Sequence, residues 1–314
     1  MPRTPESALA ALPVVVEEVA CEVGAVAVAS YPGGSRPTSE VRLGEGRGEC
    51  VAWTAAEHEA FCARLGSVPR GRWARLDAWA AAMRAEFADP YECAALEAAA
   101  IDLALRQART NLFGLIDVAP RTVRYVVSFE KVADPVERVL GEARSVELKL
   151  DADPAWDDGI YGALASLGRV AVLDFKLSGT APQHERAHRA VPQALIEDPG
   201  GRGPWSPSLW RRLSFDAAVT SAAAVDTLPT RPAAVNVKPA RMGGVLEALA
   251  CATRCRQAKI AAYLGGMFEV GVGRRQLLVL AAIACPDGPN DIAPLVDPER
   301  PARLAVDATG VGFG

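Results

Sequence analysis

From about residue 120 onward, short runs of apolar and mostly β-branched residues alternate with segments of helical periodicity. Strand signals that alternate with helix signals are typical of parallel strands joined by crossover helices, and this many repeats predicts a closed barrel. The predicted strands are residues 123–127, 146–150, 170–173, 194–196, 213–215, 234–237 and 260–264.

The N-terminal part of the chain has a different pattern. Short apolar runs at 14–16, 25–28 and 41–43 surround a Pro-, Gly- and Ser-rich segment, 31–39, which we expect to be a loop. Helical periodicity follows from Thr54 to Thr110, with the capping-box spacing TAAE at its start. We therefore predict an α+β domain over 1–118, a barrel over 119–299, and a C-terminal tail, 300–314, that packs on the first domain.

The composition of the chain limits the kinds of binding partner and the cellular location that we expect. The 314 residues are 50% hydrophobic and 23% charged with a net charge of −4, so nothing favours nucleic acid, which requires a basic surface. The apolar run from Leu277 to Cys285 is far shorter than the roughly 20 residues of a membrane helix, and the N-terminus has no export-signal pattern. The seven cysteines form no Cys-x-x-Cys pair, so we expect reduced, buried thiols and a cytoplasmic protein.

Charged residues stand at the ends of five successive predicted strands. They are Lys149, Asp174, Glu197, Asp216 and Lys238, and the intervals between them are 25, 23, 19 and 22 residues, each about one strand-helix unit. The carboxyl ends of barrel strands meet at one rim, which is where barrel enzymes keep their active sites.

Three carboxylates that face one point repel one another and cannot all stay ionised without a cation. Mg²⁺ prefers such oxygen ligands and leaves positions open for water or substrate. The flanking lysines would lie beside a cation in a partly desolvated site, and both effects lower a lysine pKa toward neutrality, where the amine can act as a base.

Several motifs, in the same order along the chain, resemble the enolase superfamily, and particularly its muconate-lactonizing-enzyme subgroup within the mandelate racemase/muconate lactonizing enzyme family. The rim residues lie in segments that resemble the barrel motifs: Lys149, 173–174, IEDP at 196–199, 215–216 and NVKPARMGG at 236–244. Outside the rim, VRLGEGRGE at 41–49 and AALEAAAIDLAL at 94–105 resemble the capping domain, and GGMFEVGVG at 265–273 and PNDIAP at 289–294 resemble the last two strands.

The resemblance implies a modified (β/α)7β barrel with an α+β capping domain, in an enzyme that removes the α-proton of a small-molecule carboxylate substrate. Asp174, Glu197 and Asp216 would bind Mg²⁺, or alternatively Mn²⁺, which stabilises the enediolate. Lys149 and Lys238 would serve as base and acid on opposite faces. The resemblance also implies that Glu269 supports the site, that the 31–39 loop closes over it, and that the protein is a homo-oligomer.

Three positions depart from the subgroup pattern: Glu147 replaces a lysine, Lys176 replaces an asparagine, and Ala217 replaces a glutamate. Lys176 would pair with a carboxylate, weaken metal affinity, or act as a third basic group near the substrate. A lyase or isomerase is therefore our first hypothesis, with cycloisomerase, o-succinylbenzoate-synthase-like and racemase or epimerase reactions all open. The alternative is an altered barrel that serves as a binding protein.

The segment HERAH at 184–188 matches the His-Glu-x-x-His motif of zinc proteases, in which two imidazoles share one helical face. It falls in the predicted crossover helix between Asp174 and Glu197, and the sequence offers no third ligand in a helical motif. We therefore keep a zinc hydrolase through His184 and His188 as a lesser alternative and expect a solvated helix surface here.

Overall fold

The computed structural model describes residues 4–28, 31–129, 146–201, 203–293, 301–306 and 313. Its N-terminal part contains a three-stranded antiparallel sheet of β2 (Val19–Ala27), β3 (Ser35–Leu43) and β4 (Gly46–Cys50). The expectation of a loop over 31–39 is wrong for residues 35–39, because these residues pair in register with β2, from Ala27 opposite Ser35 onward. A short 3₁₀ turn, Pro32–Gly34, lies between the two strands.

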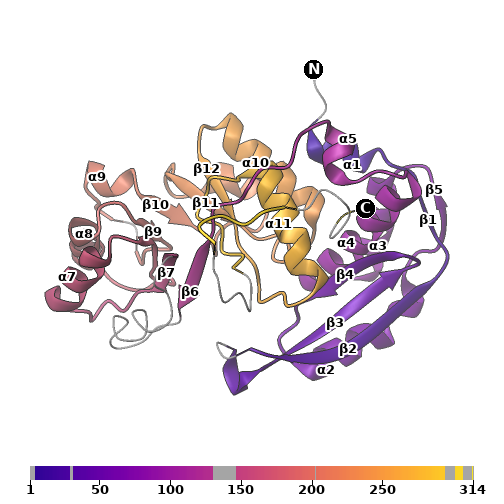
Figure 1. The fold of residues 1–314 in the computed structure, drawn as a ribbon, viewed down its shortest axis with the longest axis horizontal. Helices are drawn as coiled ribbons and strands as arrows, with labels where there is room; N and C mark the ends of the chain where they lie inside the picture. The colour runs from indigo at the N-terminus through magenta and orange to yellow at the C-terminus, as the bar shows by residue number, and fades with distance from the viewer. Residues whose placement is uncertain are drawn as a thin grey trace.

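Helices cover this sheet on one side (Figure 1). The longest, α4 (Pro90–Gln107), lies directly against β4. The close approach depends on two glycines of β4, because a Cβ on Gly46 would lie 2.2 Å from the carbonyl oxygen of Ala99, and one on Gly48 would lie 2.0 Å from that of Ala95. The other elements of this part are α1 (Pro5–Ala10), β1 (Val14–Val16), α2 (Ala55–Ala63), β5 (Gly71–Trp73), α3 (Leu76–Glu86) and α5 (Leu112–Ile116).

Seven parallel strands form the second part in the order in which they occur along the chain. They are β6 (Val126–Phe129), β7 (Glu147–Asp151), β8 (Val170–Asp174), β9 (Leu195–Glu197), β10 (Leu213–Phe215), β11 (Ala234–Val237) and β12 (Ala261–Leu264). All seven predicted strands are thus confirmed.

The eighth position of the ring is filled by two residues rather than by a strand. Asn290 forms a parallel bridge with Tyr125 beside β6, and Asp291 forms one with Gly265 beside β12. The backbone N–H groups of Val126 and Asp291 donate to Asn290 and Leu264, so the two edge strands are linked through this segment. The fold is therefore the modified (β/α)7β barrel with an α+β capping domain that the sequence predicted.

Crossover helices surround the strands. In the described part they are α7 (Asp158–Leu167), α8 (Ala181–Ala190), α9 (Pro207–Trp210), α10 (Val245–Gln257) and α11 (Val272–Ala284), with a 3₁₀ helix at Ala223–Thr227. Figure 1 shows α10 and α11 on the side of the barrel that faces α4 and β4.

Two glutamates of the N-terminal part cap the helices of the barrel. Glu97 of α4, which is fully buried, accepts a hydrogen bond from the backbone N–H of Leu246 in the first turn of α10, at 2.9 Å. Glu49 of β4 accepts from the N–H groups of Val270, Gly271 and Gly273 at 2.7, 2.8 and 2.9 Å, at the start of α11. A negative charge at a helix N-terminus satisfies otherwise unpaired donors, so these contacts hold the two parts together.

The C-terminal tail is described only in part. Leu304 forms an antiparallel bridge with Val123 at the base of the barrel, and Phe313 accepts a hydrogen bond from the N–H of Leu112 at the start of α5. Residues 300, 307–312 and 314 of the predicted 300–314 tail lie outside the described residues, and the predicted domain boundaries stay a prediction.

Among the described helices, none is both long and apolar enough to span a membrane. The expectation of reduced thiols is wrong for one pair, since Cys21 of β2 and Cys62 of α2 form a disulfide. These positions are 41 residues apart and meet only because α2 packs on β2, a contact that cysteine spacing does not reveal. The other five cysteines are free and buried, as expected.

Candidate active site

The five predicted rim residues lie at the same end of neighbouring strands. Lys149 lies within β7, Asp174 and Glu197 end β8 and β9, and Asp216 and Lys238 directly follow β10 and β11. Parallel pairing sets Asp174 beside Glu197, and Glu197 beside the residue two before Asp216. All five are buried, at most 7% exposed. The strands that carry the lysines, β7 and β11, are the neighbours on either side of the three that carry the acids.

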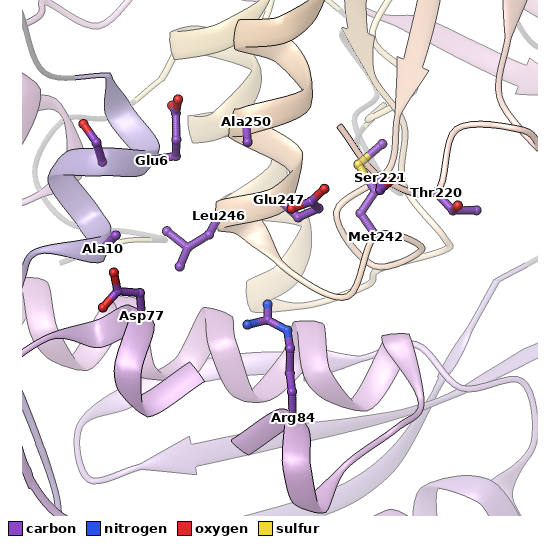
Figure 2. A pocket seen from close by; sticks show the side chains of 11 residues that line it. Glu6, Ala10, Asp77, Arg84, Thr220, Ser221, Met242, Leu246, Glu247 and Ala250 are labelled. Carbon is purple, nitrogen blue, oxygen red and sulfur yellow. The ribbon is translucent and has the colours of Figure 1, made fainter. Parts of the chain in front are cut away.

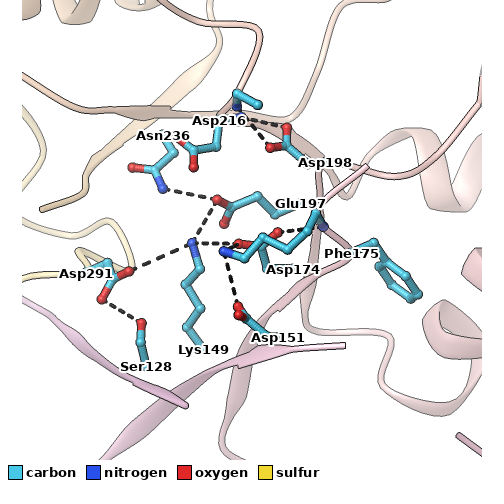
Figure 3. Close-up of polar contacts among 12 residues, drawn as sticks. Ser128, Lys149, Asp151, Asp174, Phe175, Glu197, Asp198, Asp216, Asn236 and Asp291 are labelled. Carbon is cyan, nitrogen blue, oxygen red and sulfur yellow. Dashed lines mark hydrogen bonds and ion pairs between the residues drawn. The ribbon is translucent and has the colours of Figure 1, made fainter. Parts of the chain in front are cut away.

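Lys149 is the centre of this cluster, as Figure 3 shows. Its Nζ lies 2.8 Å from Glu197 Oε1, 3.2 Å from Asp174 Oδ2 and 3.8 Å from Asp291 Oδ2. Burial opposes the charge of Lys149, but the carboxylates of Glu197 and Asp174 outweigh it and hold the pKa of Lys149 well above its ordinary value. The nearest neighbours of the amine here are carboxylates, so the lowered lysine pKa expected beside a bound metal ion and substrate stays a prediction.

Glu197 is fully buried, and its carboxylate accepts three hydrogen bonds or ion pairs. Oε1 accepts from Lys149 and from Asn236 Nδ2 at 3.1 Å, while Oε2 accepts from Tyr263 Oη at 2.8 Å. Burial raises the pKa of Glu197 to about 7, the neighbouring acids add to the effect, and Lys149 opposes it. The tight packing requires a glycine at 265, where a Cβ would lie 2.4 Å from Asn236 Oδ1.

Asp216 is held by two cations from the loop after β11. Lys238 Nζ lies 2.8 Å from Asp216 Oδ2, and Arg241 Nη1 lies 2.5 Å from Oδ1. Burial raises the pKa of Asp216, but Lys238, Lys149 and Arg241 outweigh burial and bring the pKa below its ordinary value. Asp198 fixes the backbone here, since its carboxylate accepts from the N–H groups of residues 216 and 217 at 2.9 Å each.

Lys176 pairs with a carboxylate, which was one of the three roles open from the sequence. Its Nζ lies 2.5 Å from Asp174 Oδ2 and 3.2 Å from Asp151 Oδ1. The backbone of Lys176 is in the left-handed region with φ of 49°, and its N–H donates to Asp174 Oδ1 at 3.0 Å. The side chain is 54% exposed, whereas those of Lys149 and Lys238 are 3% and 9% exposed.

Glu269 lies in the loop after β12 and is 5% exposed. Its Oε2 accepts a hydrogen bond from the N–H of Met267 at 2.7 Å, and its backbone carbonyl accepts from Arg274 Nε. Glu269 thus supports its own loop, next to the capping residue Glu49, and its role toward a substrate stays a prediction.

Five residues that contact the cluster were not singled out in the sequence. Asn236, Arg241 and Asp291 lie inside quoted motifs, so their place along the chain was a usable signal. The other two, Asp151 and Tyr263, gave no comparable signal, because their contacts with the cluster depend on tertiary packing.

The residue types fit a hard divalent cation, because three buried carboxylates on neighbouring strand ends offer the oxygen ligands that Mg²⁺ prefers. The side-chain positions place protein cations against the same oxygens: Lys149 and Lys176 on Asp174, Lys149 on Glu197, and Lys238 and Arg241 on Asp216. Within the part of the chain that the structure describes, no group of three or more His, Cys, Asp or Glu residues is arranged to hold a metal ion. Carboxylate oxygens that could bind a metal ion are thus present, and in this structure they pair with ammonium and guanidinium groups.

The histidine motif at 184–188 is not arranged as a metal site. His184 Nε2 lies 2.9 Å from the carbonyl oxygen of Ser178, and Glu185 accepts from the backbone and side chain of Ser206. The expectation of a solvated surface is also wrong, because His184 and His188 are 0% and 7% exposed on the inner face of α8. The zinc hydrolase alternative therefore receives no support from the geometry.

Two cavities lie apart from the strand-end cluster. One of about 450 Å³ lies between α1, α3 and α10 and is lined by Glu6, Asp77 and Glu247 among others (Figure 2). Each of these acids already accepts a hydrogen bond from a neighbouring residue. The other, of about 610 Å³, lies at the amino ends of the strands. Neither of these two cavities is lined by a predicted site residue.

The chain is similar to known enzymes over part of its length. It is 30% identical to the N-succinylamino acid racemase of Amycolatopsis sp over 151 residues, which are 44% of this chain and 41% of that protein. It is 37% identical to the o-succinylbenzoate synthase of Bacillus subtilis (strain 168) over 59 residues, 19% of this chain and 16% of that protein. The chain thus matches less than half the length of these relatives.

The fold similarity extends over nearly the whole chain. A dipeptide epimerase from Enterococcus faecalis V583, solved in complex with Mg and the dipeptide L-Leu-L-Tyr, superposes with a TM-score of 0.79 at 18% identity. The superposition covers 95% of this chain and 99% of that one. Structures named as enolase-superfamily members share the fold, so the fold that the sequence resemblance implied is confirmed.

Two family models together match most of the chain. The model described as the N-terminal domain of DUF8230, a domain of unknown function, matches residues 7–115, and that of its C-terminal domain matches residues 119–296. Because the second match alone covers more than half of the 314 residues, the chain belongs to the DUF8230 family, built on the fold of the enolase superfamily.

Proposed function

We propose that this protein is a lyase or isomerase that removes the α-proton of a small-molecule carboxylate with the help of a divalent metal ion. One observation carries the proposal: three buried carboxylates, Asp174, Glu197 and Asp216, end successive strands and are flanked by the two buried amines of Lys149 and Lys238. The names of the relatives, a racemase, a synthase and an epimerase, support an enzyme of this type.

Asp174, Glu197 and Asp216 would hold the metal, Mg²⁺ or Mn²⁺. When bound, the ion would supply Lewis-acid stabilisation of the charge that develops on the substrate carboxylate. Asn236 and Tyr263 donate to Glu197, and Asp198 fixes the backbone of Asp216, so these residues orient the ligands.

The two lysines come from strands on opposite sides of the acid-bearing strands, so their amines would face the two sides of one substrate carbon and exchange a proton there. In the arrangement described here, Lys149 is held as the ammonium by Glu197 and Asp174. Carboxylates that are engaged as ligands no longer stabilise this charge, so the proton on Lys149 Nζ is released more easily in the loaded site. Lys238 forms the corresponding ion pair with Asp216 on the other side of the site.

Exchange of the α-proton tests the proposal, because racemisation, epimerisation and elimination all begin with this step. The protein is incubated in D₂O with Mg²⁺ or Mn²⁺ and a library of N-succinylamino acids and dipeptides, and deuterium at the α-carbon is measured by mass spectrometry. We expect exchange with at least one class. Lys149→Met and Lys238→Met should each lower its rate by about 10² to 10⁴-fold, the contribution of a positioned acid or base.

The matched control is Lys259→Met, because Lys259 is exposed between α10 and β12, at the amino end of the strands and therefore at the opposite end of the barrel from the cluster. This variant should exchange like the wild type. Exchange that persists in both site variants would refute the assigned roles. Absence of exchange across the library would refute the enzyme and favour the alternative of a binding protein, which is motivated by the pairing of every carboxylate with a protein cation.

A further inference from the structure

We infer that Lys176 is a tethered counter-cation that competes with the divalent ion for Asp174, so that metal loading requires its ammonium group to leave this carboxylate. The inference rests on the proposed metal-dependent function and adds a control on it. It assigns Lys176 neither as an acid nor as a base.

The contacts of Lys176 place a positive charge where a ligand oxygen has to face the metal. Its Nζ and that of Lys149 both contact the same atom, Asp174 Oδ2, at 2.5 and 3.2 Å. The other oxygen of Asp174 accepts the backbone N–H of Lys176. A dication bound at Asp174 would therefore lie within a few ångströms of the Lys176 ammonium, and like charges at this distance repel strongly.

Lys176 differs from the other amines of the cluster in its route to solvent. Its side chain is 54% exposed, whereas those of Lys149 and Lys238 are 3% and 9% exposed and cannot move into water without a larger rearrangement. The backbone N–H of Lys176 stays bonded to Asp174, so the side chain can swing out while the main chain stays in place.

Asp151 lowers the free-energy cost of moving the Lys176 ammonium away from Asp174. Its Oδ1 lies 3.2 Å from Lys176 Nζ. Its side chain is 24% exposed, so Asp151 is more accessible to solvent than the fully buried Asp174. The displaced ammonium can keep this second ion pair while it leaves Asp174. Lys176 therefore lowers metal affinity without blocking the site, and it neutralises Asp174 in the metal-free protein.

Binding of Mg²⁺ and Mn²⁺ by the full-length protein, measured by isothermal titration calorimetry at constant ionic strength, tests the inference without any substrate. Lys176→Met removes the charge and keeps the length of the side chain, and we expect it to bind both ions at least about tenfold more tightly than the wild type. Lys176→Arg keeps the charge and should bind like the wild type.

Lys259→Met is an unusually close control. Lys259 is also exposed and also lies in the left-handed region, with φ of 56° against 49° for Lys176, so both changes place methionine in the same backbone conformation. Its metal affinity should equal that of the wild type, and circular dichroism melting should show that all variants remain folded.

The outcomes separate the two proposals. Equal binding by the wild type and Lys176→Met, or weaker binding by the variant, overturns the inference while the metal-dependent function stands. Absence of binding to either protein overturns both, because the removal of Lys176 then opens no metal site. Tighter binding by Lys176→Met and also by Lys259→Met overturns the inference as well, since the effect would then follow total charge and not the contact with Asp174.

Discussion

Replacement of Glu49 by glutamine should loosen the contact between the capping domain and the barrel. The carboxylate of Glu49 is 8% exposed and accepts from three backbone N–H groups, those of Val270, Gly271 and Gly273, at distances of 2.7 to 2.9 Å. Oε1 serves the first of these donors and Oε2 serves the other two. Glutamine keeps only one oxygen, so its NH₂ group would face at least one of these N–H donors and leave it unsatisfied.

The expected loss of stability follows from the number of hydrogen bonds that the substitution removes. A hydrogen bond to a charged group contributes about 1.5–3 kcal/mol, and the negative charge at the N-terminus of α11 adds roughly 0.3–1 kcal/mol. The loss of one such bond and of the charge should therefore lower the free energy of unfolding by about 2–4 kcal/mol. Because Glu49 joins two parts of the chain, we also expect the variant to unfold with a broader transition if the parts separate.

Urea unfolding followed by circular dichroism and tryptophan fluorescence measures this change. The matched control is Glu45→Gln, which makes the same substitution in the same hairpin at an exposed position and should change the free energy by less than about 0.5 kcal/mol. Indistinguishable midpoints for the two variants would refute the capping role of Glu49.

Two further predictions concern buried groups. Gly244→Ala should lower the free energy of unfolding in urea by about 2–4 kcal/mol, because φ here is 156° and a Cβ would lie 2.2 Å from Glu97 Oε1, which caps α10. The control is Gly162→Ala, where a Cβ would have no atom within 4 Å, and it should not lower the free energy of unfolding. Equal effects of the two changes would contradict the reasoning. Burial lowers the pKa of His58, so below about pH 6.5 the unfolded chain takes up a proton that the folded protein resists. The stability advantage of the wild type over His58→Gln should therefore shrink by about 1.4 kcal/mol per pH unit as the pH falls below about 6.5, and parallel unfolding curves from about pH 7.5 to 5.5 would contradict this.

The sequence determined the elements that depend on neighbours along the chain. Seven apolar runs predicted seven strands at nearly the observed positions, because strand and helix periodicities are local properties. Regular spacing then predicted that Asp174, Glu197 and Asp216 share one rim, since parallel strands in one barrel bring their carboxyl ends together. The loop over 31–39 was the local exception, as β3 begins at Ser35 where pairing with β2 outweighs turn-forming composition.

Only the tertiary structure decided which side chains contact one another within the barrel and the capping domain. The sequence left three roles open for Lys176, and its contacts with Asp174 and with Asp151 at the end of β7 show that it forms ion pairs. The Cys21–Cys62 disulfide, the burial of His184, and the capping of α11 by Glu49 each join residues that belong to separate elements. Such contacts depend on how helices and strands pack across long sequence separations, and side-chain direction, burial and charge partners exist only once that packing is set.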